Sequence, residues 1–160
     1  MNPRLYDPAM RAAVLVLTTS HVMLRRLSGG RLGDRIPGVG QIVWLSTIGR
    51  RSGKRRRTPL LAVRDGAEPA APYVVTGSNG GQSVSPGWVF NLRAHPEAGI
   101  EVNGTSYAVR AEEVTDEAER VRLYGELTRS WRGYAGYARQ TSRRLPVFRL
   151  HLTTAHPPKS

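Results

Sequence analysis

Residues 42–64 read IVWLSTIGRRSGKRRRTPLLAVR, two apolar stretches joined by a short run of cations and glycines. The apolar stretches, residues 42–47 and 58–64, are rich in aliphatic and β-branched side chains, as is typical of strands. The turn sequence Asp65-Gly66 follows the second stretch. Two strands joined by so short a connection predict an antiparallel pair, and the rest of the chain extends outward from it.

A second pair of strands lies farther along the chain. Residues 100–102 and 105–109 flank Asn103-Gly104, a sequence that favours a type I′ turn because both of its central residues have positive φ. Two more strands are predicted at residues 73–76 and 146–153, the second from its alternating pattern. Most of these strands are joined by short connections, which indicates antiparallel pairing.

Two helices are predicted between these strands. The first has Ser85 as its N-cap and Pro86 at its first position, and it ends near residue 94. The second begins at Asp116, with Glu119 three residues later as in a capping box. Its expected apolar face consists of Val121, Tyr124, Leu127 and Trp131. This order of elements predicts an α+β fold, a small, mainly antiparallel β-barrel with peripheral helices.

The N-terminal part predicts an amphipathic helix over residues 9–27, because apolar residues recur there at helical spacing beside several arginines. The segment is too short and too interrupted to span a bilayer, and no signal-peptide cleavage site follows it. Packing on the domain and contact with an anionic membrane both remain open. We expect residues 1–40 to be helix and linker, residues 41–160 to be the barrel domain, and the location to be cytoplasmic, with peripheral membrane association as the open alternative.

The composition excludes several kinds of site. The chain has no cysteine, so disulfides, thiolate metal sites and cysteine nucleophiles are excluded. The four histidines show no metal-binding spacing, and no metal site is expected. The formal net charge of +12 predicts attraction to polyanions: nucleic acid, anionic lipid or a phosphorylated cofactor. The total charge does not choose among them, so its distribution must.

The densest charge lies in residues 49–57, GRRSGKRRR, between the first two predicted strands. Gly49 and Gly53 permit positive φ, so backbone N–H groups can converge on an anion while the arginines supply bidentate contacts. The spacing is not that of a Walker A loop. A solvated hairpin tip and a nucleic-acid contact explain the same residues.

Two further segments are candidates for a site. Residues 76–81, TGSNGG, precede a helix start and suit a planar polar ligand or a phosphate, although they are also ordinary loop composition. Trp131, Tyr134 and Tyr137 are three residues apart and would project from one side of a helix. They form either a core stripe or the wall of a substrate site, in which a phenol can donate a proton.

In this order and spacing, the segments resemble the deazaflavin-dependent nitroreductase family of actinobacteria, over residues 42–152. The most specific part is residues 47–53, TIGRRSG, followed by Arg56, Thr58, Pro59 and Leu60. The other matching residues are Ser78, Gly80, Gly81, Pro86, Trp88, Asn91, Leu92, His95 and Pro96. The resemblance implies a split β-barrel that binds coenzyme F420.

The resemblance also implies roles for individual residues. Those expected to hold the cofactor are Arg50, Arg51, Ser52, Arg56, Arg57, Thr58, Pro59, Leu60, Leu61, Thr76, Gly77, Ser78, Asn79, Gly87, Trp88, Val89, Phe90 and Asn91. The expected substrate wall is Trp131, Tyr134 and Tyr137. Ser78, Tyr134 and Tyr137 are the catalytic candidates that would stabilise or protonate the product anion. The chain departs from the family pattern at Asn79, often lysine, and at Trp131, often tyrosine.

The implied activity is hydride transfer from reduced coenzyme F420 to a small electron-poor acceptor, such as a quinone, an enone or a nitro compound. Two alternatives stay open: a split-barrel reductase that uses FMN, and a non-catalytic protein that binds nucleic acid or an anionic surface through its arginines. The second explains the charge but not the ordered match over residues 78–91. No specific nucleic-acid partner is therefore expected.

Overall fold

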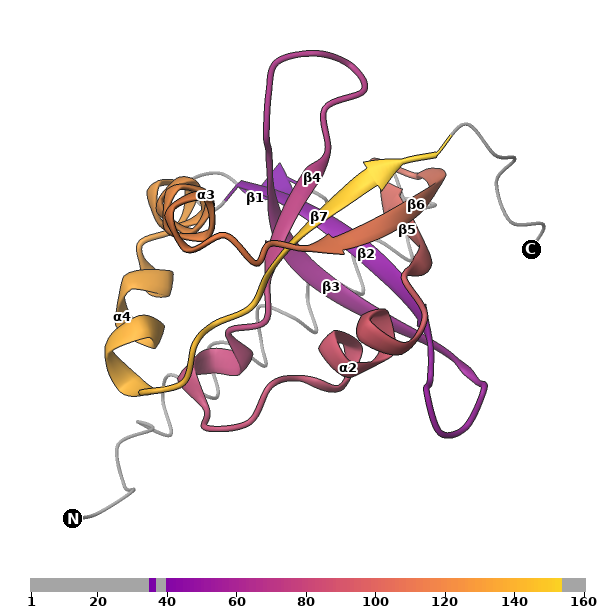
Figure 1. The fold of residues 1–160 in the computed structure, drawn as a ribbon. Helices are drawn as coiled ribbons and strands as arrows, with labels where there is room; N and C mark the ends of the chain where they lie inside the picture. Colours follow the sequence, from indigo (N-terminus) through magenta and orange to yellow (C-terminus); the bar gives the residue numbers. More distant parts are fainter. Residues whose placement is uncertain (1–34, 37–39, 154–160) are drawn as a thin grey trace.

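The computed structural model describes residues 35–36 and 40–153, which form a barrel of strands with helices at its side and end (Figure 1). The helix predicted over residues 9–27 lies outside these residues, and its contact with a membrane stays a prediction. No helix in the two described ranges is long and apolar enough to cross a membrane.

Six of the strands close into an antiparallel barrel, because they follow one another in the order β2-β3-β4-β7-β6-β5 and β5 pairs back to β2. The short strand β1 extends the sheet beyond β2. The strands are β1 (Arg35–Ile36), β2 (Gly40–Ile48), β3 (Arg55–Arg64), β4 (Tyr73–Thr76), β5 (Glu97–Val102), β6 (Thr105–Glu113) and β7 (Val147–Leu152). The predicted α+β barrel is confirmed.

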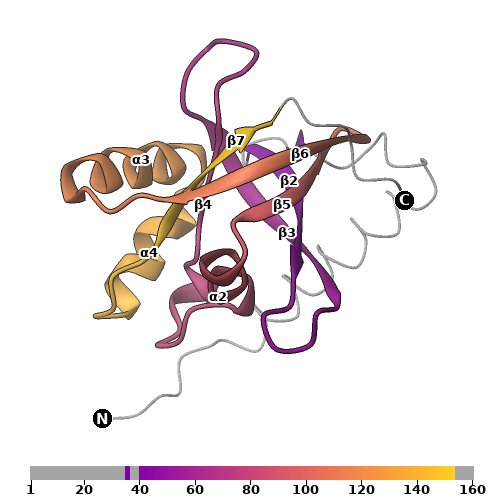
Figure 2. The same ribbon diagram turned by 45° about the vertical axis from the view of Figure 1, so that its right-hand side comes forward.

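Helices cover one side of this barrel and one of its ends (Figures 1 and 2). α3 (Glu117–Ser130) and α4 (Gly133–Gln140) lie together at the side, and α2 (Gly87–Ala94) lies near the β2–β3 connection. A 3₁₀ turn, η1 (Asn79–Gly81), packs against α4. Asp116 caps α3 as predicted, its side chain accepting a hydrogen bond from the Glu119 backbone N–H at 2.8 Å.

The apolar core has two parts because several strands bury side chains on both faces. Val75 and Phe148 point into the barrel, where Trp88, Val89 and Leu92 of α2 join them. Their neighbours in the chain, Val74 and Val147, pack instead under α3 and α4 with Leu61, Leu123, Leu127 and Tyr134. Successive strand residues face opposite sides, so a strand covered on both faces carries a continuous apolar run.

Two helix predictions were wrong. Ser85 is not the N-cap of α2: Pro86 occupies that position without a capping side-chain bond, and the Ser85 hydroxyl accepts from Arg143 instead. Val121 is 56% exposed, while Leu123 and Leu127 form the buried face of α3. The spacing of apolar residues on this helix allows two overlapping apolar faces, and packing against the barrel determines which of them is buried.

Both predicted hairpins are present. Asn103 and Gly104 have φ of 50° and 79°, as a type I′ turn requires, and join β5 to β6. β3 begins at Arg55, three residues before the predicted start at residue 58, and its first residues pair with the end of β2. Exposed arginines extend this strand because the ladder uses backbone groups only and both faces are solvated there.

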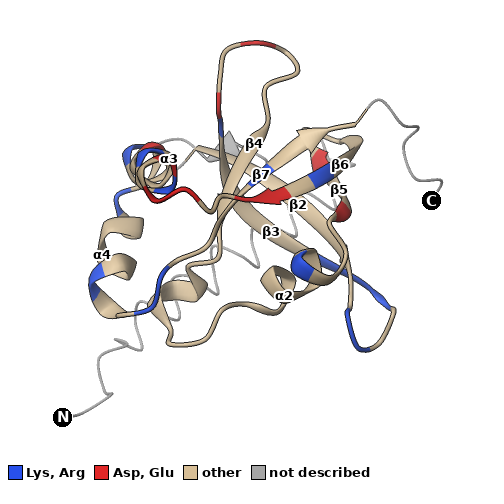
Figure 3. Ribbon diagram, in the orientation of Figure 1, with Lys and Arg blue, Asp and Glu red and all other residues tan. Residues whose placement is uncertain are grey.

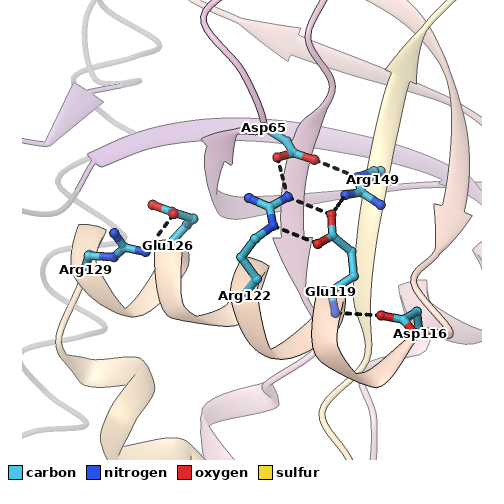
Figure 4. Close-up of polar contacts among 7 residues, drawn as sticks. All are labelled: Asp65, Asp116, Glu119, Arg122, Glu126, Arg129 and Arg149. Carbon is cyan, nitrogen blue, oxygen red and sulfur yellow. Dashed lines mark hydrogen bonds and ion pairs between the residues drawn. The ribbon is translucent and has the colours of Figure 1, made fainter.

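A cluster of four charged residues ties the end of β3 to α3 and β7 (Figure 4). Arg122 donates to Asp65 and to Glu119 at 2.7 Å, and Arg149 donates to Asp65 at 2.8 Å and also pairs with Glu119. Burial alone would raise the pKa of Asp65, but the hydrogen bonds from Arg122 and Arg149 outweigh it and lower that pKa. We call Asp65, Glu119, Arg122 and Arg149 the charge cluster.

Candidate functional site

A cavity of about 490 Å³ lies between the β2–β3 connection and α2. It joins two segments that are about forty residues apart in the sequence. Its lining residues are Gly49, Arg50, Arg51, Ser52, Arg56, Thr58, Pro86, Gly87, Trp88 and Asn91. Eight of these ten were predicted as cofactor contacts, and the remaining two, Gly49 and Pro86, belong to the matched segments.

The connection between the strands, residues 49–54, owes its shape to short-range backbone hydrogen bonds. The Gly49 N–H donates to the Lys54 carbonyl at 2.9 Å, and the Gly53 N–H donates to the Gly49 carbonyl at 2.8 Å. Gly53 has φ of +64°, a conformation that glycine adopts without steric cost. We call residues 49–56, which include the first arginines of β3, the cationic loop.

Asn91 of α2 fixes the cationic loop to the helix. Its side-chain oxygen accepts the Arg50 backbone N–H at 3.1 Å, and its nitrogen donates to the Thr47 hydroxyl at 3.1 Å. Asn91 is buried, so both ends of its amide are used by the protein. It lines the cavity but also determines where the loop lies, and direct contact with a ligand stays a prediction.

The cations of this loop are largely uncommitted. Within the described residues, Arg51 and Arg56 have no carboxylate partner, and the Arg50 guanidinium lies 4.8 Å from the centre of the Phe90 ring. Lysine and arginine residues are concentrated in the β2–β3 connection at this end of the barrel (Figure 3). Exposed guanidinium groups without carboxylate partners, beside backbone N–H donors and glycines, can bind a phosphate or a carboxylate.

Arg57 lies on the other face of β3. Arg56 and Thr58 line the cavity, whereas Arg57 pairs with Glu101 of β5 and lies 4.9 Å from the Trp44 ring centre. Alternation along the strand places Pro59 and Leu61 on that same outer face, and Leu61 packs under the helices. Direct cofactor contact by these three residues stays a prediction, and the described contacts do not bring them to the cavity.

Several of the other predicted residues pack within the barrel and do not line the cavity. Leu60 packs against the barrel interior, and Val89 is fully buried there. Thr76 is buried, and its hydroxyl donates to the Pro146 carbonyl at 2.9 Å. These contacts hold the barrel end together, so a loss at any of the three is expected to affect folding as well as binding.

Residues 77–85, which we call the neutral loop, include most of the predicted segment 76–81 and are shaped by backbone conformation and close packing. Asn79, Gly80 and Gly81 have φ of 47°, 62° and 78°. A methyl group added at Gly77 would lie 2.6 Å from Val89 and 2.9 Å from Pro146, so only glycine fits there. Ser78, a catalytic candidate, is buried at the start of this loop.

Arg143, which the sequence did not single out, contacts the neutral loop. Its guanidinium donates to the carbonyls of Gly77, Ser78 and Gln82, each at 2.8 Å, and to the Ser85 hydroxyl at 3.2 Å. Burial lowers the pKa of Arg143. Nothing local distinguishes Arg143 from Arg144 in the sequence, since the partners of the Arg143 guanidinium lie at least 58 residues away.

The three predicted aromatic residues form a cluster, but not along one helix. α3 ends at Ser130, Trp131 has extended backbone, and α4 begins at Gly133. The ring centres are nevertheless 5.2 Å apart for Trp131–Tyr134, 5.5 Å for Trp131–Tyr137 and 6.1 Å for Tyr134–Tyr137. None of them is among the described residues that line the cavity. Their role as a substrate wall stays a prediction.

Tyr134 is the most buried of these aromatic residues, only 6% exposed. Burial raises its pKa above the ordinary range, so its hydroxyl keeps its proton at neutral pH. Its backbone carbonyl accepts from the Tyr124 hydroxyl at 2.7 Å. Within the described residues its own hydroxyl makes no hydrogen bond. A buried phenol of this kind is a hydrogen-bond donor rather than a ready source of protons.

The cluster is connected to the neutral loop. A Cβ placed on Gly81 would lie 3.3 Å from the backbone of Tyr137 and 2.8 Å from the Gln140 side chain. The backbone of η1 therefore packs directly against α4. Within residues 35–36 and 40–153, no three histidine, aspartate or glutamate residues are grouped so that they could hold a metal ion.

Comparison with known proteins places these features in a family. The family described as F420H(2)-dependent quinone reductase matches residues 17–151. An F420H(2)-dependent quinone reductase of Mycobacterium tuberculosis strain H37Rv is 34% identical over 129 residues, which cover 79% of this chain and 84% of that protein.

Solved structures agree with this match. The F420-H2 dependent reductase FDR-A superposes with a TM-score of 0.60 at 32% identity, over 69% of this chain and 93% of that one. HutZ, the heme storage protein from Vibrio cholerae, superposes with a TM-score of 0.54 at 13% identity, over 81% of this chain and 89% of that one. At that identity, HutZ shows only that the fold is shared.

Proposed function

The chain belongs to the F420H(2)-dependent quinone reductase family, and from this we propose that it transfers a hydride from reduced coenzyme F420 to a quinone. The observation that carries the proposal is the family match across residues 17–151, which includes the cationic loop, the neutral loop and α4. It favours a quinone over the enone and nitro compounds that the sequence also allowed.

The residues around the cavity fit a cofactor that bears a phosphate and carboxylates. Arg51 and Arg56 are exposed and have no carboxylate partner among the described residues, and Gly49 and Ser52 line the same cavity. Hydrogen bonds from such cations to an anion contribute about 1.5–3 kcal/mol each. The binding energy gained there positions the reactive ring elsewhere in the site.

Each part of the site then has a task. The arginines of the cationic loop bind the anionic part of the cofactor, and Asn91 keeps that loop against α2. The neutral loop, with Ser78, leads directly into Pro86 at the cavity and would lie against the ring and exclude water from it. When bound, reduced coenzyme F420 would supply the hydride.

The acceptor gains negative charge when it takes a hydride, and the protein must stabilise that charge. Ser78, Tyr134 and Tyr137 are the proposed donors. Because its pKa is raised, Tyr134 would stabilise an oxyanion through a hydrogen bond, and the proton itself would come from solvent. Trp131, Tyr134 and Tyr137 would together form the apolar side of the acceptor site.

Titration of the protein with F420 and with FMN tests which cofactor binds, and oxidation of F420H2 in the presence of a quinone tests the reaction. We expect the absorbance of F420 to change on binding, FMN to bind much more weakly, and F420H2 to be oxidised only when a quinone is added. Binding of FMN with no binding of F420 would replace this proposal by a flavin reductase. Binding of F420 without oxidation by any of several quinones would limit the protein to cofactor binding.

A further inference from the structure

Arg143 occupies an unusual position, in the connection between α4 and β7. Its Nη2 donates to the carbonyls of Gly77 and Ser78, its Nε to the carbonyl of Gln82, and its Nη1 to the hydroxyl of Ser85. These four acceptors come from both ends and the middle of the neutral loop. One guanidinium therefore contacts the loop along its whole length.

The contacts require the shape of arginine. A guanidinium presents its donors in one plane and in fixed directions, whereas an ammonium offers three donors from a single point. Three of the acceptors are carbonyls at 2.8 Å, and bonds from a charged donor to such acceptors are stronger than neutral ones. Within the described residues, Arg143 has no carboxylate partner that would hold it elsewhere.

The loop needs such a partner because its own hydrogen bonds are mostly local. Gly81 N–H donates to the Ser78 carbonyl at 2.9 Å, and the Asn79 side chain donates to the Val84 carbonyl at 2.9 Å. At its start, the Gly77 N–H donates to the Pro146 carbonyl at 2.9 Å. The bond to Pro146 places only the start of the loop, and the local bonds set the shape of the rest without placing it relative to the barrel.

We propose that Arg143 is a positioning residue for hydride transfer, a role that rests on the proposed function. By fixing the carbonyls of Gly77 and Ser78, it would set the surface against which the deazaflavin ring is held and so align the ring with the acceptor. The anionic part of the cofactor is held separately, at the cationic loop. Arg143 therefore affects the rate of the reaction more than the affinity for F420.

Arg143→Lys separates position from charge, because it keeps the cation and loses the planar fork. Arg144→Ala is the matched control, since Arg144 is the next residue but bonds to Glu117 and to the Thr115 carbonyl, away from the loop. Misplacement of reacting groups by about 1 Å can lower a rate about a hundredfold. We expect kcat of Arg143→Lys to fall about tenfold to a hundredfold, while its Kd for F420 stays within about threefold.

Two measurements on the full chain test this. Hydrogen–deuterium exchange without cofactor should be faster in residues 77–85 of Arg143→Lys and unchanged in the barrel strands. With F420 bound, the absorbance spectrum of the ring should differ between Arg143→Lys and wild type. Arg144→Ala should match wild type in exchange, spectrum and kcat.

Each result decides something. Faster exchange with lower kcat and near-normal affinity supports the proposal. Unchanged exchange in residues 77–85, or a kcat equal to that of Arg144→Ala, overturns it, as does loss of protection throughout the barrel in Arg143→Lys. If wild type fails to bind F420 or to reduce a quinone, the proposed function fails. Exchange then reports only whether Arg143 holds the loop.

Discussion

The two ends of β3 use arginine in opposite ways (Figures 3 and 4). At its start, Arg51 and Arg56 of the cationic loop are exposed beside a cavity and have no carboxylate partner among the described residues. At its end, Asp65 meets Arg122 and Arg149, and the Arg149 side chain is only 16% exposed. The first group is available to a ligand, and the second is committed to the fold.

Solvation explains the difference. Water solvates an exposed guanidinium, so an exposed arginine needs no carboxylate partner and stays available to an anionic ligand. A charge withdrawn from water must be paired and hydrogen-bonded, because leaving it alone costs several kcal/mol. Among the described residues, the arginines of these two groups therefore differ in role, and those without carboxylate partners are available to an anionic ligand.

The largest expected effect comes from replacing both Arg50 and Arg56 by alanine. At about 1.5–3 kcal/mol for each charged hydrogen bond, the Kd for F420 should rise about tenfold or more per residue and about a hundredfold in the double variant. Stability should change little, since both side chains are exposed. Titration with F420 measures the Kd, and urea unfolding measures the stability.

If neither single variant changed the affinity, the cationic loop would not belong to the cofactor site. The arginines of the cationic loop would then differ from those of the charge cluster in exposure and not in ligand binding. Arg110→Ala is the matched control, because Arg110 is also exposed but pairs with Glu97 on β5.

Arg149→Ala should have the opposite effect. It removes hydrogen bonds to Asp65 and Glu119 in a partly buried site and leaves Asp65 with one arginine. We expect the free energy of unfolding to fall by about 1.5–3 kcal/mol, with the Kd for F420 unchanged. Urea unfolding at neutral pH is the measurement. A variant as stable as wild type would mean that Arg149 of the charge cluster does not stabilise the fold.

The pH dependence of stability should follow the carboxylates of the cluster. The hydrogen bond from Arg122, followed by that from Arg149, lowers the pKa of Glu119 from 4.5 to about 2. A lowered pKa contributes stability that is fully present above the unfolded value and is lost as the pH falls from about 4.5 to about 2. Chemical unfolding measured across this window should show the decline, and Glu119→Gln should make it shallower. An equally steep decline in that variant would assign it to other carboxylates.

Arg129→Ala should have the smallest effect. Arg129 pairs with Glu126 three residues before it on α3, and its side chain is 71% exposed (Figure 4). Pairs of this kind contribute little, so the free energy of unfolding should change by less than about 0.5 kcal/mol. Comparison of its urea midpoint with that of Arg149→Ala measures how far burial, rather than pairing, determines the contribution of an arginine.

Much of the fold and part of the site could be predicted because the signals are local. The Asn103-Gly104 turn, the Asp116 cap and the glycines of the cationic loop act within a few residues of themselves. Helix faces were less certain, since the spacing around Val121 and Leu123 fits two stripes and the barrel selects one. Trp131, expected on a helix, ends it instead.

By itself, the sequence determined the antiparallel strand pairs, the place of the cationic loop between two strands, and a charge that favours an anionic ligand. Only the tertiary structure decided which arginines meet carboxylates, that Asn91 holds the cationic loop, and that Arg143 rather than Arg144 reaches the neutral loop. Turns and caps depend on neighbours in the chain, whereas these contacts join residues tens of positions apart. They come into being only when the barrel closes and brings distant segments together.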